Sequence, residues 1–127
     1  ALATCDEFFG EPATLYTSLY YERGSEQALH RDTPYFCTHP ADRYLGVWLA
    51  LDDVDSGNGP LRVVPRSHLL PAIDVDALAR KLFPDPSVIP AISDAGWNAY
   101  QAAVQHQCDE RGMQAQDVPV QRSTVLL

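Results

Sequence analysis

The sequence lacks a cysteine framework, a long apolar run and a secretion signal, and each absence excludes a class of protein. Its 3 cysteines are odd in number and include no Cys-x-x-Cys pair, which excludes a disulfide scaffold and a zinc ribbon. We therefore expect a reducing, cytoplasmic setting in which Cys37 and Cys108 are partly buried apolar residues. The longest apolar run, 44–51, is far shorter than the roughly 20 residues of a membrane span, so we expect no membrane association. No basic segment followed by an apolar one precedes a cleavage site, so nothing indicates secretion.

Basic residues are also scarce. The formal net charge of -8 gives no indication of a basic surface that would bind nucleic acid or an anionic membrane, and it favours solubility. At 127 residues and 46% hydrophobic, the chain is long enough for one globular domain at most, spanning 1–127. It begins without Met and ends in 124–127, a run typical of the start or middle of a buried strand. We therefore expect a fragment of a longer protein.

The first two-thirds of the sequence has the composition of short strands separated by turns. The segment 14–22 is dense in aromatic and β-favouring residues, and 44–51 is apolar on both faces, as in an inner strand covered on both sides. A turn cluster with an Asn-Gly signal at 52–59 leads into a predicted strand at 61–64. With a last strand predicted over 118–127, this spacing favours a sandwich or barrel over a doubly wound sheet.

The periodicity becomes helical between about residues 72 and 113. Apolar residues recur from Val75 to Leu82, Asp74 is placed to cap this helix, and Pro84 to end it. A longer helix is predicted to open at Ser93 and to stop near Gly112. Its apolar stripe consists of Trp97, Tyr100, Val104 and Cys108. We interpret this part as a helical insertion between strands of one β domain.

The stretch 27–32 carries the main candidate chemistry, because it places an imidazole and a carboxylate two residues apart. Residues at i and i+2 of an extended segment project from the same face, so His30 and Asp32 can converge on one metal ion. They would be two of the three ligands in the 2-His-1-carboxylate triad of non-haem Fe(II), which leaves positions open for a co-substrate and O2. The structural alternative is a hydrogen-bonded His–Asp pair at a strand end, so the flanking sequence has to decide.

Three blocks, 20–36, 46–54 and 58–68, surround and follow this stretch. They strongly resemble the phytanoyl-CoA dioxygenase family, because they occur in the family's order and at close to its spacing. The family's usual glycine before Ser67 is Arg66 here, which we expect to be a local turn change of little consequence. The resemblance implies a mainly β fold, a double-stranded β-helix (jelly roll, cupin-like) that is incomplete in this chain and carries the helical insertion. It also implies an enzyme that uses Fe(II), 2-oxoglutarate and O2 to hydroxylate a small organic substrate, releasing succinate and CO2.

The resemblance also implies roles for five residues. His30 and Asp32 correspond to the family's first two iron ligands, and Trp48 matches a tryptophan near the 2-oxoglutarate site. Ser18 and Tyr20, on one face of the predicted strand, correspond to positions that line the cofactor pocket. Because Asp32 is retained where halogenating relatives lack this carboxylate, we favour hydroxylation.

Two functional residues of the family have no counterpart in this chain. Its distal histidine and its 2-oxoglutarate-binding arginine lie beyond the strand that 120–127 begins, and Arg122 comes too early to be that arginine. None of His39, His68 and His106 occupies the place of the missing ligand. Two alternatives stay open: a jelly-roll binding or structural domain without catalysis, and a cupin-like metalloenzyme that uses iron without 2-oxoglutarate. Substrate identity and oligomeric state do not follow from the sequence.

Overall fold

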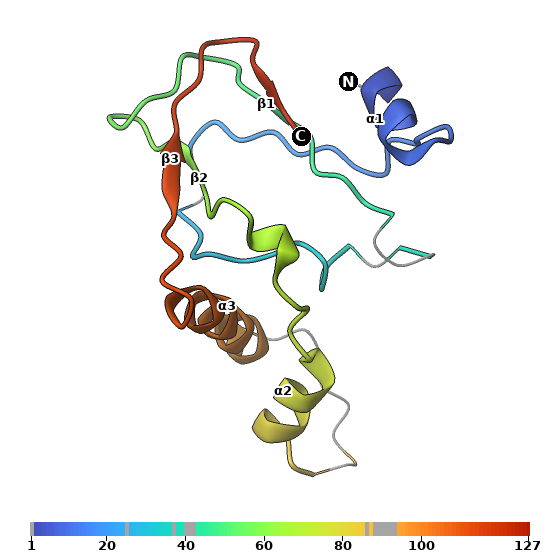
Figure 1. Cartoon of the computed structure of the whole chain (residues 1–127), viewed down its shortest axis with the longest axis vertical. Helices are drawn as coiled ribbons and strands as arrows, with labels where there is room; N and C mark the ends of the chain where they lie inside the picture. Colours follow the sequence, from blue (N-terminus) through green and yellow to red (C-terminus); the bar gives the residue numbers. More distant parts are fainter. Residues whose placement is uncertain (1, 25, 37, 40–42, 86, 88–93) are drawn as a thin grey trace. The chain divides into compact units, whose positions relative to one another are not determined.

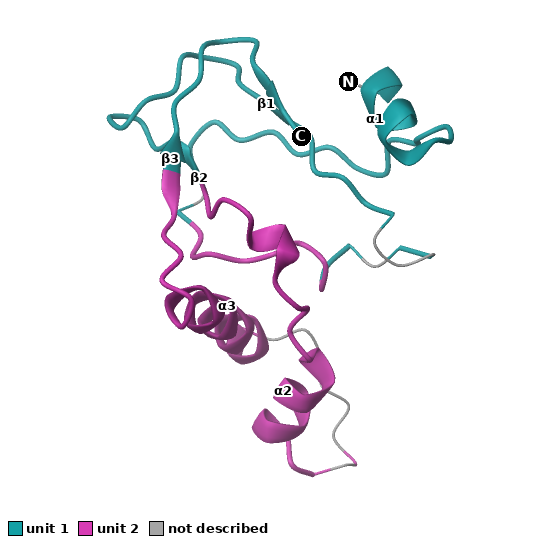
Figure 2. Ribbon diagram, viewed as in Figure 1, with its two compact units in different colours: residues 1–26, 35–62, 117–127 teal, residues 27–34, 63–116 magenta. Residues whose placement is uncertain are grey.

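The computed structural model groups into two compact units, each described by itself (Figures 1 and 2). Unit 1 comprises residues 1–26, 35–62 and 117–127, and unit 2 comprises 27–34 and 63–116. The structure describes residues 2–24, 26–36, 38–39, 43–85, 87 and 94–127. The predictions for Cys37 and for a helix start at Ser93 lie outside the described residues. One domain spanning the whole chain stays a prediction.

Unit 1 is held together by the antiparallel pairing of strands β1 (Trp48–Leu49) and β4 (Val125–Leu126) (Figure 1). In their register Trp48 lies opposite Leu126 and Leu49 opposite Val125. Ala50 extends the pairing, because its N–H donates to the Thr124 carbonyl at 3.0 Å and its carbonyl accepts from the Ser123 N–H at 2.8 Å. Ala50 is 2% exposed, so the buried part of this unit includes the end of β1.

Helix α1 (Leu2–Phe9) was not predicted from the sequence. It buries Cys5, and Gly10 follows it at φ 70°, a left-handed conformation that glycine adopts at helix ends without strain. Asp6 fixes the exit of the chain, because its carboxylate accepts a hydrogen bond from the backbone N–H of Ala13 at 2.6 Å. The i, i+3 spacing of Leu2, Cys5 and Phe8, followed by Gly10, was the signal that could have indicated this helix.

The prediction of a strand over 14–22 is wrong for this structure. No strand is assigned there, and the large side chains of Tyr16, Leu19 and Tyr20 are 67–79% exposed. A strand requires a hydrogen-bonded neighbour, and none of the strands in the described part of the chain pairs with this segment. β-favouring composition alone therefore did not determine the local structure.

The strand predicted over 44–51 is shorter than expected and covered on one face only. Its regular part is β1, and Val47, Leu49 and Leu51 are about half exposed while Ala50 is buried. Side chains alternate between the two faces of a strand, so the exposed residues share one face. The expectation that both faces are covered is therefore wrong.

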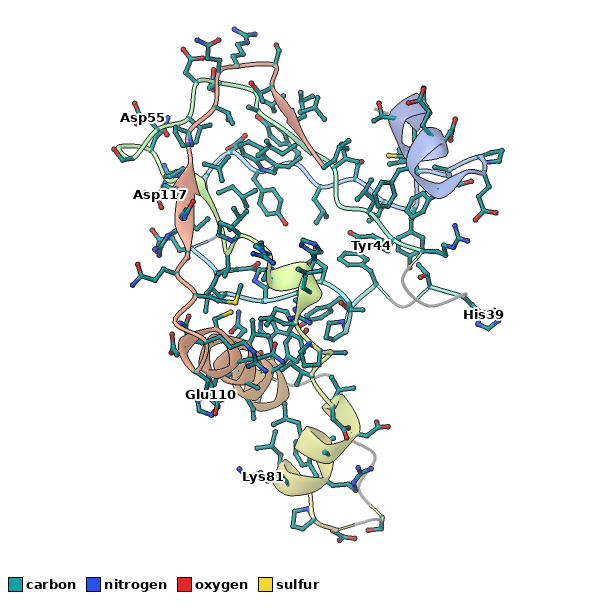
Figure 3. All side chains as sticks on the ribbon, viewed as in Figure 1. His39, Tyr44, Asp55, Lys81, Glu110 and Asp117 are labelled. Carbon is teal, nitrogen blue, oxygen red and sulfur yellow. The ribbon has the colours of Figure 1, made fainter. Side chains whose placement is uncertain are left out.

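The turn predicted over 52–59 is confirmed. The Asn58 side chain bridges it, accepting from the Asp55 N–H and donating to the Asp53 carbonyl, both at 2.8 Å. The Asp55 carboxylate accepts from the Gly57 N–H at 2.7 Å, and Asp55 lies at the turn between β1 and β2 in Figure 3. Gly59 has φ 82°, so the Asn-Gly signal marked a position that needs glycine.

A second two-stranded sheet pairs β2 (Leu61–Val63) with β3 (Gln116–Val118). An ion pair crosses it at 3.1 Å, between Nε of Arg62 and a carboxylate oxygen of Asp117. β2 confirms the strand predicted at 61–64. The strand predicted over 118–127 is broken into the end of β3, an isolated bridge at Val120 and β4, because a turn with Ser123 at φ 70° interrupts it.

Unit 2 contains the short 3-10 helix η1 (Ser67–Leu69) and helices α2 (Val75–Leu82) and α3 (Asp94–Asp109). The predicted cap of α2 is confirmed: the Asp74 carboxylate accepts from the Ala77 N–H at 2.8 Å. α2 packs against α3. The predicted helical part is thus present, with a chain exit from α2 at Phe83, directly before Pro84.

Helix α3 has the predicted apolar stripe, since Tyr100, Val104 and Cys108 are its buried residues. Two hydrogen bonds close its end: the Met113 N–H donates to the Cys108 carbonyl at 3.0 Å, and the Gly112 N–H to the Asp109 carbonyl at 2.9 Å. This is a Schellman motif, and Gly112 supplies its left-handed residue at φ 62°. The stop near Gly112 is therefore confirmed.

Arg66 adopts φ 67°, so it occupies a left-handed turn position that suits the glycine expected there. This conformation costs an L-residue about 1–2 kcal/mol, while glycine loses about 0.5–1 kcal/mol more in backbone entropy on folding. We therefore expect Arg66→Gly to raise the free energy of unfolding in urea by about 0.5–1 kcal/mol. Arg80→Gly, in the last turn of α2, is the matched control and should lower this free energy by about 0.5–1 kcal/mol. Equal destabilisation by both variants would contradict the strain at Arg66.

The sheets formed by the described residues are two-stranded, and the jelly-roll fold stays a prediction. In the described ranges, no helix combines the length and the apolar character that crossing a membrane would need.

Candidate functional site

The two predicted iron ligands lie side by side in unit 2. Nε2 of His30 is 3.4 Å from Oδ1 of Asp32, in the segment 27–34, to which no helix or strand is assigned. The His30 side chain is 25% exposed and the Asp32 side chain 47% exposed. The i, i+2 spacing therefore brings an imidazole and a carboxylate together at a position that solvent can reach.

A backbone carbonyl fixes the orientation of the His30 ring. Nδ1 of His30 lies 2.7 Å from the carbonyl oxygen of Ala28, which can only accept, so Nδ1 carries the proton and donates. Nε2 is the nitrogen that faces Asp32. A neutral imidazole in this tautomer directs the lone pair of Nε2 toward the carboxylate. This is the arrangement of metal-binding histidines, whose second nitrogen donates to a carbonyl or carboxylate.

Aromatic residues of α3 support the ring. The His30 and Trp97 rings meet edge to face with centroids 5.3 Å apart, and Trp97 stacks on Tyr100 at 5.6 Å with an angle of 16°. Tyr100 is 5% exposed, and burial raises the pKa of its phenol; the nearby charge of Arg31 lowers that pKa and the charge of Asp32 raises it. The group behind the imidazole is thus a neutral, packed aromatic pair.

A second histidine–carboxylate pair shows what distinguishes the first. His106 and Glu110 lie one helical turn apart near the end of α3, with Nε2 of His106 3.5 Å from Oε1 of Glu110; Glu110 is labelled in Figure 3. The distance resembles that of the His30–Asp32 pair, but the His106 side chain is 74% exposed. His30 differs in its bonded Nδ1 and its packed ring. The hydrogen bond to Nδ1 and the contact with Trp97 hold the His30 ring in one orientation, as a metal ligand needs. An exposed ion pair on a helix does not need a fixed ring.

The donor set and spacing of His30 and Asp32 fit a divalent metal ion. Imidazole nitrogen and carboxylate oxygen are ligands that iron accepts, and two donors each about 2.1 Å from one ion are at most about 4.2 Å apart. The 3.4 Å between Nε2 of His30 and Oδ1 of Asp32 is within that limit. If the imidazole is protonated, the same contact is an ion pair without a metal. Titration with a metal ion distinguishes a metal site from such an ion pair.

The described residues contain no group of three or more His, Cys, Asp or Glu side chains that could hold a metal ion. His39 and His68 are exposed. In the part of the chain that the structure covers, the pair therefore supplies two donors of a candidate centre.

The three predicted cofactor-binding residues all lie in unit 1. Trp48 is a half-buried residue of β1, while Ser18 and Tyr20 are exposed residues of a segment without regular secondary structure. The shared face expected for Ser18 and Tyr20 depended on a strand that is not formed. Because His30 and Asp32 belong to unit 2, contact of these three residues with a cofactor stays a prediction.

The residues that anchor the pair were not predicted from the sequence. Arg31 lies between the two candidate ligands, and its guanidinium donates to Gln107 of α3 and to three carbonyls around η1. Alternation in an extended segment places Arg31 on the face opposite to His30 and Asp32, a signal that was available. The sequence contains no signal for what that face meets, or for the contact of Trp97 with His30.

An imidazole Nε2 opposite a carboxylate defines a candidate mononuclear metal centre with two ligands of the 2-His-1-carboxylate type. The family model described as phytanoyl-CoA dioxygenase (PhyH) matches residues 3–122. The chain therefore belongs to the PhyH family, a family of Fe(II)- and 2-oxoglutarate-dependent oxygenases. The resemblance found in the sequence is confirmed.

Individual relatives match a shorter part of the chain. "Phytanoyl-CoA dioxygenase domain-containing protein 1" of Bos taurus is 44% identical over 45 residues, which are 35% of this chain and 16% of that protein. Its namesake in Danio rerio is 42% identical over 45 residues, with the same two shares. The matched part is thus a small fraction of these relatives. No solved structure matches the chain.

Proposed function

We propose that the protein is an Fe(II)- and 2-oxoglutarate-dependent dioxygenase that hydroxylates a small organic substrate, with His30 and Asp32 as iron ligands. The observation that carries this proposal is the 3.4 Å approach of Nε2 of His30 to Oδ1 of Asp32, with Nδ1 bonded to the Ala28 carbonyl. Membership of the PhyH family supports the same reaction class. A jelly-roll fold and a cytoplasmic setting belong to the proposal.

Bound iron would supply activation of O2, coupled to oxidative decarboxylation of 2-oxoglutarate to succinate and CO2. The residues of this chain bind and orient. The carbonyl of Ala28 keeps the proton on Nδ1 of His30, so that Nε2 is free to bind, and Trp97 limits rotation of the ring. Asp32 adds a negative charge that favours a cation, and its partial exposure leaves the donor accessible.

The remaining parts of the proposed site concern 2-oxoglutarate and the third ligand. We assign Trp48, Ser18 and Tyr20 to the surroundings of 2-oxoglutarate, on the resemblance of their sequence positions alone. The triad also requires a second histidine, and an arginine would hold the distal carboxylate of 2-oxoglutarate in two parallel hydrogen bonds. Neither role is assigned to a described residue.

The proposal is tested by turnover of 2-oxoglutarate. The full-length protein is incubated with Fe(II), ascorbate and 2-oxoglutarate, with and without candidate small-molecule substrates, and succinate and CO2 are measured. We expect equal amounts of both products, with a rate that a chelator lowers to background and added Fe(II) restores. Asp117→Ala, which removes an exposed carboxylate paired with Arg62, serves as the control and should leave the rate unchanged.

Two negative outcomes have different meanings. Tight Fe(II) binding without any turnover of 2-oxoglutarate would contradict the proposal and favour a cupin-like metalloenzyme. Failure to bind Fe(II) at all would favour a jelly-roll binding or structural domain without catalysis. Either outcome would rule out the proposed dioxygenase reaction, while membership of the PhyH family would stand.

A further inference from the structure

Arg31, in the segment that carries the two candidate ligands, donates four hydrogen bonds through its guanidinium. Nη2 donates to the Ser67 carbonyl at 3.2 Å and to Oε1 of Gln107 at 3.1 Å. Nη1 donates to the Pro71 carbonyl at 3.2 Å and, more weakly, to the Leu70 carbonyl at 3.5 Å. These partners are 36–76 residues away in sequence, so one side chain joins the segment to η1, to the chain after it and to α3.

The position of Arg31 in the sequence couples these bonds to the ligands. Arg31 is covalently bonded to both His30 and Asp32, so any displacement of its backbone moves both donors. No helix or strand is assigned to 27–34, and contacts of side chains therefore contribute much of what holds this segment in place. At η1 the guanidinium is a second donor to the Ser67 carbonyl, which also accepts from the Leu70 N–H at 3.1 Å.

Gln107 completes a closed set of hydrogen bonds. Its Oε1 accepts from Arg31, while its Nε2 donates to the Pro71 carbonyl at 3.0 Å. Because arginine only donates and a carbonyl only accepts, the amide has a single orientation that satisfies both partners. Gln107 precedes the buried Cys108 on α3, whose end is fixed by the Schellman motif. The anchor of Arg31 is therefore a rigid helix.

We propose that Arg31 is a positioning residue for the His30–Asp32 metal pair, acting with Gln107 to hold the backbone between the two ligands against α3 and η1. This inference rests on the proposed function, because it concerns the same pair. A metal centre holds its ion tightly only when its ligands are fixed close to the binding geometry. The helical insertion would then influence the affinity of the site for Fe(II), although it supplies neither of the two ligands.

The shape of the side chain makes the inference specific to arginine. Its planar guanidinium reaches four acceptors, three in the stretch 67–71 and one on α3, which a lysine ammonium, a compact donor, does not reproduce. Arg31→Lys keeps the charge and loses the fork, while Arg31→Ala loses both. Arg111→Ala is the matched control, because the Arg111 guanidinium donates to the backbone carbonyl of Gln107 at 3.1 Å and pairs with Glu110 at 4.0 Å, both away from the segment 27–34.

The test is an anaerobic titration of the full-length protein and its variants with Fe(II) alone, which gives a Kd and a stoichiometry. We expect Arg31→Ala to raise the Kd by about 10-fold or more, within the 10–100-fold range of residues that support metal ligands. Arg31→Lys should fall between Arg31→Ala and the wild type, and Arg111→Ala should stay within about twofold. Stoichiometry should remain that of the wild type, because the ligands themselves are present.

Stoichiometry separates positioning from folding. A variant that binds less iron per molecule at the wild-type Kd has lost folded protein, and this result for Arg31→Ala would overturn the inference. Should Arg31→Ala not fold, Gln107→Ala provides the decision: a raised Kd at full stoichiometry supports positioning, and an unchanged Kd contradicts it. A wild-type protein that binds no Fe(II) would instead overturn the proposed function, a distinguishable failure.

Discussion

Replacing Asp32 with alanine should weaken Fe(II) binding by at least about 100-fold, because loss of residues that merely support a ligand already costs about 10–100-fold. The variant should fold like the wild type. The Asp32 side chain is 47% exposed and pairs with His30, so its removal opens no cavity. We expect its free energy of unfolding to change by no more than about 0.5–1 kcal/mol. Anaerobic titration with Fe(II) and urea unfolding measure the two effects independently.

The other histidine–carboxylate pair supplies the controls for this prediction. His30→Ala should weaken Fe(II) binding by at least about 100-fold, as Asp32→Ala does. His106→Ala, which removes a similarly spaced but exposed pair with Glu110, should leave Fe(II) binding unchanged. Turnover of 2-oxoglutarate should follow the same order. Unfolding of both His30→Ala and Asp32→Ala would instead indicate that the pair has a structural role.

The second large effect is expected at Tyr100, in the aromatic support behind the imidazole. Tyr100 is 5% exposed and stacks on Trp97, so Tyr100→Ala removes a packed ring and leaves a cavity. Truncations of buried aromatic residues cost about 3–5 kcal/mol, and we expect a loss in this range by urea unfolding. Fe(II) affinity should fall as well, because Trp97 would lose the ring that holds it against His30.

Two variants show whether burial of the ring causes this loss. Tyr100→Phe keeps the stacked ring and should cost less than about 1.5 kcal/mol. Tyr16→Ala removes a tyrosine that is 79% exposed, and it should change stability by about 0.5 kcal/mol or less. A loss at Tyr100→Ala no greater than that at Tyr16→Ala would contradict the packing described for α3.

Elements fixed by local chemistry were the ones that the sequence predicted well. Asp74 caps α2 through a bond three residues away, and the 52–59 turn forms through Asn58 and the aspartates beside it. The stripe along α3 was correct because an i, i+3, i+4 pattern needs only a covered face. In each case the interacting groups lie within one helix or one turn.

The strand predictions other than that for 61–64 failed, in whole or in part, for the corresponding reason. The segment 14–22 has a strand composition, but strand structure depends on a partner that composition does not specify. The same limit explains why 44–51 was expected to be covered on both sides. At the site, the proximity of His30 and Asp32 followed from their spacing, whereas Gln107, 76 residues from Arg31, could only be found in three dimensions.

The central claim is that His30 and Asp32 bind one iron ion together, and crystals of the full-length protein grown without O2 and loaded with Fe(II) test it most directly. Anomalous scattering at the iron absorption edge locates the metal independently of any model of the protein. The account predicts a single strong peak about 2.0–2.2 Å from both Nε2 of His30 and an oxygen of Asp32. Iron bound elsewhere, or no peak between these two side chains at a saturating concentration, would contradict it.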